Sequence, residues 1–224
     1  SAAKLDNKET EALARVGLAM AAAYHGAGDM AEENIEKATT LAKQLKGTAE
    51  QTMVHSKAAQ LYGILMDLAA DDTEHRKYLA KSGAAYQEAI RIAQDAGDEK
   101  SQAYNQGYLA GLYQIEGRHN EALTLCRSAL RLAQKHRLLD AVYQWQWQVG
   151  RLHRALGDSD RAIEAYKGAL DNLQTVRSDL AIIYGSANSP TTFRESVGPV
   201  FFELADLLLQ KASQETNLDR QTAL

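Results

Sequence analysis

A register of 40 residues is the feature that most constrains how this chain can fold. Tyr86, Cys126 and Tyr166 are separated by 40 residues twice over. Small residues follow each of them at the same offset: Ala89, Ala129 and Ala169. Close packing of two helices requires small residues at fixed helical offsets from a bulky one. The pattern therefore predicts one helical unit, repeated, instead of a single globular core.

Turn signals separate the two helices of each predicted unit. Gly117-Arg118-His119-Asn120 precedes the Cys126 segment, and Gly157-Asp158-Ser159-Asp160 precedes the Tyr166 segment. Glycine suits the left-handed residue that ends a helix, and Asn or Asp suits the N-cap of the next one. We therefore interpret the repeated unit as a helical hairpin.

Proline placement supports an all-helical fold. The only prolines among the 224 residues, Pro190 and Pro199, lie near the C-terminal end, so the strongest helix breaker is absent before them. Stacked hairpins predict an all-α, right-handed α-solenoid with a concave and a convex face. The expected hairpins span 5–46, 49–96, 99–136 and 138–184, followed by a loop at 185–191, a capping helix at 192–213 and a flexible tail at 214–224.

Charge and composition exclude several classes of protein. The formal net charge is −4, and even residues 101–160 carry only seven Lys and Arg against five Asp and Glu. This is far from the basic excess of a nucleic-acid-binding domain. No apolar run is long enough to cross a bilayer, so we expect a cytoplasmic protein without membrane contact. A single cysteine rules out a disulfide framework.

The last two predicted hairpins resemble tetratricopeptide repeats. Trp147 to Asp158 and the segment after it match that family's small residue, Gly-Asp turn, alanine, aromatic and Ala-Leu positions: Gly150, Gly157-Asp158, Ala162, Tyr166 and Ala169-Leu170. The preceding unit matches at Ala110, Tyr113, Gly117, Ala122, Ala129 and Leu130, and departs at Cys126, where an aromatic is usual. Looser matches extend the resemblance over most of residues 9–176. It implies a protein-interaction scaffold with a concave groove.

The C-terminal segment adds a second resemblance. The core Phe-Arg-Glu-Ser-Val-Gly-Pro-Val begins at Phe193, and Asp206 opens an Asp-Leu-Leu-Leu run. This segment looks like the junction of bacterial CHAT proteins, in which tetratricopeptide repeats precede a caspase-like protease domain. The resemblance implies a regulatory region of a larger bacterial chain that controls such a domain. The plainer interpretation, a capping helix, is expected in either case.

A partner-binding wall is predicted on the first helix of the fourth hairpin. Hydrophobic residues there recur at spacings of four and three, which indicates a core face: Leu138, Val142, Trp145, Val149, Leu152 and Leu156. Trp147 lies about 200° around the helix from Trp145, on another face. The first helices of such hairpins line the concave groove, so this second face is a candidate for peptide binding.

The predicted groove combines aromatic, amide and basic side chains from two hairpins: Tyr104, Tyr108, Gln144, Trp147, Gln148, Arg151 and Arg154. Such residues suit a protein or peptide ligand, and the local positive charge favours an acidic or C-terminal carboxylate group. The alternative is that Trp147 packs against the first helix of the next unit. The sequence leaves both possibilities open, together with the oligomeric state.

Catalytic and metal sites find little support. Cys126 occupies the slot of two tyrosines and is expected to pack as an inert buried thiol. The six histidines include no His-Glu-x-x-His pattern, and we expect no metal and no cofactor. An enzyme would need a closed pocket of pKa-shifted groups, with His153, Tyr113 and Glu116 as its candidates. The remaining alternative is a stand-alone or transcription-regulator-linked repeat sensor that binds a peptide or a small signalling molecule.

Overall fold

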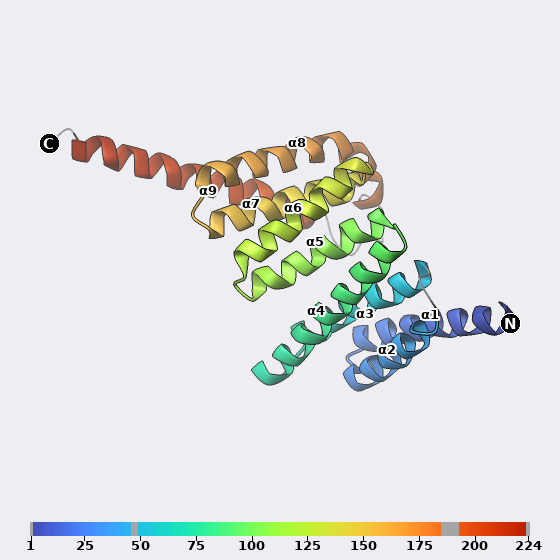
Figure 1. Cartoon of the computed structure of the whole chain (residues 1–224). Helices are drawn as coiled ribbons and strands as arrows, with labels where there is room; N and C mark the ends of the chain where they lie inside the picture. Colours follow the sequence, from blue (N-terminus) through green and yellow to red (C-terminus); the bar gives the residue numbers. More distant parts are fainter. Residues whose placement is uncertain (1, 46–48, 185–192, 223–224) are drawn as a thin grey trace. The chain divides into compact units, whose positions relative to one another are not determined.

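The computed structural model describes residues 2–45, 49–184 and 193–222, and within these ranges it contains helices and no strand (Figure 1). The helices are α1 (Ala2–Tyr24), α2 (Gly28–Ala42), α3 (Ala49–Asp67), α4 (Asp72–Asp95), α5 (Glu99–Ile115), α6 (His119–Lys135), α7 (Leu139–Ala155), α8 (Ser159–Tyr184) and α9 (Phe193–Thr222). The all-helical fold class predicted from the register is thus observed.

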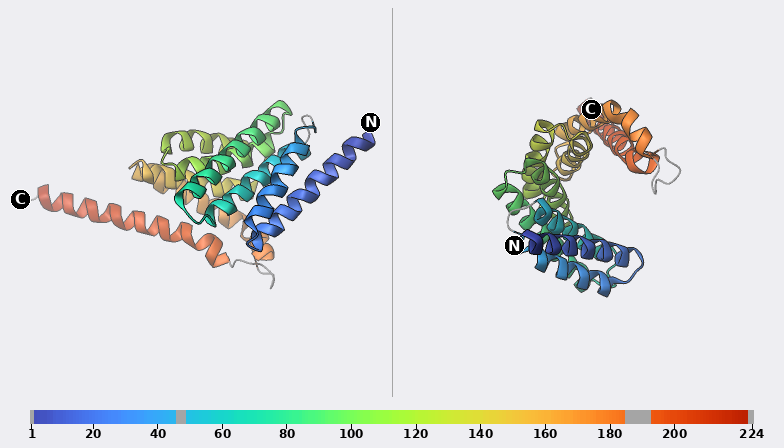
Figure 2. Two further views of the ribbon diagram at one scale, coloured as in Figure 1. Left: turned by 90° about the horizontal axis from the view of Figure 1, so that it is seen from below. Right: turned by 90° about the vertical axis from the view of Figure 1, so that its right-hand side faces the viewer.

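Consecutive helices pack together as hairpins. Helix α1 packs on α2, α3 on α4 and α7 on α8, as the views of Figures 1 and 2 show. The chain divides into two compact units, residues 1–112 and 113–224. Each unit is described by itself below.

The helix bounds follow the predicted segments with three differences. Helix α1 begins at Ala2, before the predicted start of the first hairpin at residue 5. Helix α2 ends at Ala42, where the prediction placed the end of the hairpin at residue 46. Helix α9 continues to Thr222, so the expected tail from residue 214 is helical over most of its length. The Gln-, Glu- and Arg-containing sequence there favours a helix, and no glycine or proline interrupts it. The predicted loop at 185–191 lies outside the described residues.

The turns use glycine as predicted, and one of the two predicted caps is in place. Gly117 and Gly157 adopt φ values of 73° and 79°, in the left-handed region that favours glycine. Asp158 Oδ1 accepts a hydrogen bond from the backbone N–H of Arg161 at 3.2 Å. Helix α6, by contrast, has Arg118 at its N-cap without a side-chain cap, so Asn120 does not cap it.

The repeated register positions are buried in both units. Tyr86 is 5% exposed, and Cys126 and Tyr166 are inaccessible. The alanines three positions later are fully buried as well: Ala89, Ala129 and Ala169. Burial at these positions removes apolar surface from water and lets the paired helices approach closely. The register therefore marks the hairpin cores.

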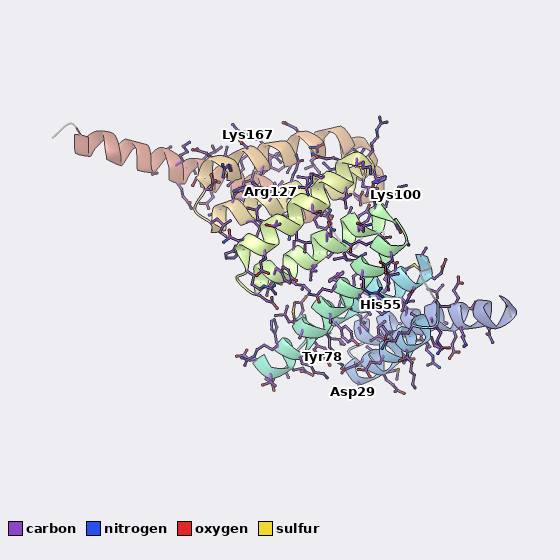
Figure 3. All side chains as sticks on the ribbon, viewed as in Figure 1. Asp29, His55, Tyr78, Lys100, Arg127 and Lys167 are labelled. Carbon is purple, nitrogen blue, oxygen red and sulfur yellow. The ribbon has the colours of Figure 1, made fainter. Side chains whose placement is uncertain are left out.

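In the first unit, a half-buried carboxylate links α2 to α4. Glu32 on α2 is only 16% exposed and accepts hydrogen bonds from Lys77 Nζ at 2.9 Å and from Tyr78 Oη at 3.0 Å. Lys81 adds an ion pair to the same carboxylate. Figure 3 labels Tyr78, which stacks on Tyr62 of α3 with ring centroids 6.3 Å apart. Partial burial raises the pKa of Glu32, but the bonds from Lys81, Lys77 and Tyr78 outweigh it and bring the pKa down to about 2.

Replacing Glu32 by Gln should weaken the first unit and flatten its acid sensitivity. Because the folded pKa lies below the unfolded one, the contribution of Glu32 is present above about pH 4.5 and is lost as the pH falls toward 2. We expect a loss of about 1 kcal/mol in the free energy of unfolding at pH 7, since the two lysines are partly solvated. Urea titrations followed by circular dichroism at several pH values measure this.

The matched control for that variant is Glu33→Gln, because the neighbouring Glu33 is 62% exposed and forms an ion pair with Lys37 of the same helix. Stability of this control should not change measurably. An unaltered pH profile in Glu32→Gln would contradict the role assigned to the carboxylate.

In the second unit, the close approach of α7 to α8 depends on Gly150. A Cβ atom added there would lie 3.2 Å from three ring atoms of Tyr166. Such a separation is tighter than ordinary van der Waals contact, so the ring would have to move. At Gly63, in the middle of α3, an added Cβ would meet no atom within 4 Å. The two glycines therefore differ in function although both lie inside helices.

Alanine substitution at these two glycines should separate packing from helix propensity. We expect Gly63→Ala to raise the free energy of unfolding by about 0.5–1 kcal/mol, because alanine loses less backbone entropy in a helix. Gly150→Ala should be at least about 1 kcal/mol less favourable than Gly63→Ala, because the same gain is offset by overpacking against Tyr166. Urea midpoints of the two variants provide the comparison, and equal gains would contradict the close contact.

Candidate functional site

Helix α7 presents two distinct faces, as its sequence predicts. Val142, Trp145, Val149 and Leu152 are each at most 8% exposed and form the core face. Leu156, the last residue of the predicted core face, is more exposed, at 38%, and lies just after the end of the helix. Trp147, Arg151 and Arg154 lie on another face, and we call these three residues the α7 wall.

The α7 wall is occupied by side chains of α9. Trp147 Nε1 donates a hydrogen bond to Glu203 Oε2 at 2.9 Å, and Arg151 Nε donates to the same oxygen at 3.0 Å. Tyr166 Oη of α8 donates to it as well, also at 3.0 Å. The Arg151 guanidinium lies 4.0 Å from the centroid of the Trp147 ring. Donors from two helices therefore converge on one carboxylate.

The Glu203 carboxylate is held ionised by these donors. Its side chain is 23% exposed, and burial by itself raises its pKa. The hydrogen bonds from Arg151 and Trp147 more than offset this, so that the pKa lies below its usual value. The pKa of the Tyr166 hydroxyl is raised, first by burial and then by the charge of Glu203. Charge-assisted bonds of this kind are stronger than neutral ones.

Further ion pairs and an apolar seam extend the contact along α9. Arg154 pairs with Asp206, and Lys211 pairs with Asp160 at the start of α8. Beside them, apolar residues of α9 join the core of the second unit: Val200, Leu204 and Leu207, packed with Ala162, Ile163, Tyr166 and Ala169. Helix α9 is thus fastened to the hairpin by both burial and charge.

The structure places the seven predicted groove residues in different surroundings. The three wall residues contact α9, as the alternative of packing against a following helix expects. Gln148 Oε1 lies 3.5 Å from Cys126 Sγ, and Gln144 is partly buried. Tyr104 and Tyr108 belong to the first unit, where Tyr108 is 37% exposed and stacks on Tyr86 with ring centroids 5.9 Å apart. The two groups are therefore described separately.

Cys126 and His153 occupy packing environments. Cys126 Sγ donates to the Trp145 carbonyl at 3.4 Å, and burial raises the pKa of its thiol to about 12. A thiol with such a pKa stays protonated and is a poor nucleophile. His153 is 4% exposed, and its Nε2 lies 3.0 Å from Arg127 Nη2, so the ring accepts a bond from Arg127, which Figure 3 labels. Burial and then the charge of Arg127 lower the pKa of His153.

The three residues considered for an enzymatic site lie in two different environments. Arg118 lies 3.8 Å from the Tyr113 ring centroid and pairs with Glu116 at 2.8 Å. His153 instead faces Arg127 and Asp158. Among the described residues no group of three or more His, Cys, Asp or Glu side chains could hold a metal ion. In the same part of the chain no helix is long and apolar enough to cross a membrane.

A surface cavity of about 370 Å³ lies along α1 and α2. Its lining is mostly charged: Glu11, Arg15, Glu33, Glu36, Lys37, Thr40 and Leu41. Arg15 already pairs with Glu11, and Lys37 with Glu33. Because these charges are mutually satisfied and partly solvated, the cavity lacks the convergent unpaired polar groups that small-molecule sites have.

Sequence reasoning missed two features of the site. The capping helix and the family resemblance predicted for the α9 segment do not identify Glu203 and Asp206 as partners of Arg151 and Arg154. The signal was present, because both the acidic and the basic pair have a spacing of three residues and would each lie on one helix face. Sequence reasoning also missed the polar contact of α3 with α5, where Ser56 Oγ donates to the buried Asn105 Oδ1 at 2.7 Å.

Comparison with known proteins shows which fold the chain is similar to. Residues 99–175 match the tetratricopeptide repeat family. No curated protein matches the sequence. The matched residues include the two hairpins in which the repeat motifs are clearest, and this family match indicates a protein-interaction scaffold.

Solved structures of similar fold cover nearly the whole chain. BtubC (BKLC) from P. vanneervenii is 19% identical over 98% of this chain and 90% of its own, with a TM-score of 0.62. A Podosopora anserina protein described as a kinesin light chain with nearly identical TPR-like repeats is 14% identical, covering 94% of this chain and 92% of its own, with a TM-score of 0.65. At these identities the likeness establishes the fold alone, which is that of TPR-like repeat proteins.

Replacing Glu203 by Gln should loosen α9 from the α7 wall. The amide can still accept from Trp147, but it removes the charge that Arg151 faces, and we expect a loss of about 1–2 kcal/mol in the free energy of unfolding. Hydrogen exchange at the α9 amides should also become faster. Glu164→Gln, at an exposed acidic residue of α8, is the control and should alter neither quantity. Unchanged exchange in Glu203→Gln would mean that the apolar seam alone holds α9.

Proposed function

We propose that this chain is a protein-interaction and regulatory module whose α7 wall binds a carboxylate-bearing helical segment of a partner protein. The observation that carries the proposal is the convergence of Trp147, Arg151 and Tyr166 on one carboxylate of α9. In this arrangement α9 acts as an internal ligand, and a partner with acidic residues spaced by three or four positions competes for the same donors. The match to tetratricopeptide repeats over residues 99–175 supports a binding function of this kind.

The chemistry of the wall favours an acidic ligand on physical grounds. Arginine stacked on an indole ring retains its hydrogen-bonding edge while its face is desolvated, which strengthens carboxylate binding. Arg154 offers a second cationic site one helical turn away, matched in α9 by Asp206. Gln144 and Gln148, on the same helix, would extend the predicted groove within the second unit.

A competition experiment on the full chain tests this function. Glu203→Lys places a cation opposite Arg151 and should release α9 from the wall. A fluorescently labelled peptide of residues 198–213 should then bind this variant at least ten times more tightly than it binds the natural chain. Fluorescence polarisation measures the affinity. Adding Arg151→Ala and Trp147→Ala to Glu203→Lys should abolish the gain, while circular dichroism checks that helical content is retained.

Two control peptides sharpen that experiment. A peptide in which Gln and Asn replace Glu203 and Asp206 should bind weakly, because only the charges are removed. If both peptides bind the Glu203→Lys chain equally, recognition is apolar and the carboxylate function is wrong. If neither peptide binds any variant, the wall serves only to attach α9.

The second part of the proposal is that the chain regulates a caspase-like domain of a larger CHAT-type protein. Its support is the resemblance of the Phe193–Leu209 segment, which forms the first part of α9. The sequence of the encoding gene beyond the codon for Leu224 tests it directly. A following domain with caspase-like His and Cys residues would support the linkage, and a stop codon there would contradict it. In the latter case the peptide-binding repeat sensor becomes the better description.

A further inference from the structure

Helix α9 has a second apolar face that the hairpin does not cover. Phe202 and Leu209 are 68% and 69% exposed, and Phe201 and Leu208 are 47% and 42% exposed. Ala205 is exposed between them. At 100° per residue these five side chains fall within an arc of about 120° on one side of the helix. We call them the α9 stripe.

The α9 stripe lies where the packing of this fold places another helix. In α7, the residues that contact α6 (Gln148 and His153) and those that contact α8 (Gln146 and Gly150) are separated by roughly 110° around the helix axis. In α9, the face buried against α8 and the α9 stripe are separated by roughly 130° in the same rotational sense. The stripe therefore has the orientation of a helix-packing face without a helix on it.

The order of residues in the α9 stripe is symmetric about Ala205. Phe201 and Phe202 lie four and three positions before it, and Leu208 and Leu209 lie three and four positions after it. If two such helices cross antiparallel with their alanines at the centre, each phenylalanine pair meets a leucine pair. The small residue at the crossing point allows the backbones to approach closely. A two-fold symmetric contact needs a self-complementary patch of this kind.

The size of the stripe suits the apolar centre of an interface between two copies. With about 200 Å² per large side chain, the exposed parts of its four large residues amount to roughly 450 Å² per copy. Stable protein interfaces bury about 800 Å² per partner, of which the apolar centre is the part that matters most. On a monomer, a contiguous apolar patch of this extent is commonly an interaction site.

We propose that two copies of this chain associate through the α9 stripe, with their α9 helices antiparallel and crossing at Ala205. The proposal is independent of the α7 wall, because the stripe and the wall-facing residues Glu203 and Asp206 occupy different sides of α9. The part of α9 that extends beyond α7 and α8 is visible in Figures 1 and 2.

Light scattering coupled to size-exclusion chromatography tests the association on the full chain. We expect a mass twice that of the single chain at micromolar concentrations, and the mass of a single chain in Phe202→Glu with Leu209→Glu. Both side chains are more than two-thirds exposed, so these substitutions should leave the fold and its circular dichroism unchanged. Leu68→Glu, at an apolar residue that is 60% exposed elsewhere, is the matched control and should remain dimeric.

Cysteine cross-linking tests the antiparallel crossing. Ala205→Cys lies on the two-fold axis and should form a disulfide with its own copy under mild oxidation. Phe201→Cys should not, because the two Phe201 positions are about 12 Å apart along the helices. Mixing Phe201→Cys with Leu209→Cys should restore the cross-link. The natural Cys126 does not compete, since it is fully buried.

Three outcomes would overturn the proposal. A single-chain mass at all concentrations up to about 100 µM would mean that the stripe serves a different partner or none. A dimer that survives Phe202→Glu with Leu209→Glu would place the interface elsewhere. Equal self-cross-linking at positions 201 and 205 would require parallel helices and contradict the symmetric arrangement.

Discussion

The Tyr166 side chain is the contact on which the rest of the second unit depends. Its ring packs against Gly150, where no Cβ keeps α7 at a distance, and its hydroxyl reaches past the hairpin to Glu203 of α9. The ring belongs to the apolar seam that includes Val200 and Leu204. One residue therefore sets both the spacing of α7 and α8 and the position at which α9 attaches.

The difference between packing within a hairpin and contacts to α9 explains which features could be predicted from the sequence. Positions such as Tyr166 and Ala169 repeat every 40 residues because hairpin packing imposes the same steric demand in each unit, so periodicity reveals them. Gly157 could be predicted for a similarly local reason, since few residues other than glycine adopt the left-handed conformation that this turn requires. The partners of Arg151 could not be predicted from the 40-residue register, because an ion pair between segments 52 residues apart leaves no periodic trace. Only the three-residue spacing that Glu203 and Asp206 share with the two arginines indicated this ion pair.

In the two proposals above, the two faces of α9 give this helix more than a capping function. One face carries carboxylates and apolar side chains that satisfy the α7 wall and the α8 core, and the other carries the α9 stripe. Carboxylate binding is specific and depends on charge, whereas the stripe is apolar and depends on area. A partner that displaces α9 from the wall would therefore also change the presentation of the stripe. The two proposals, recognition and association, therefore both involve this one helix.

The account rests on the claim that the α7 wall recognises a carboxylate on a neighbouring helix, and a double-mutant cycle tests it most directly. Stability is measured by urea unfolding for the natural chain, Arg151→Ala, Glu203→Ala and the double variant. We predict a coupling energy of about 1–2 kcal/mol between the two side chains, as expected for a charge-assisted contact that is partly exposed to solvent. A coupling energy below about 0.5 kcal/mol, which is typical of solvated surface pairs, would contradict the claim.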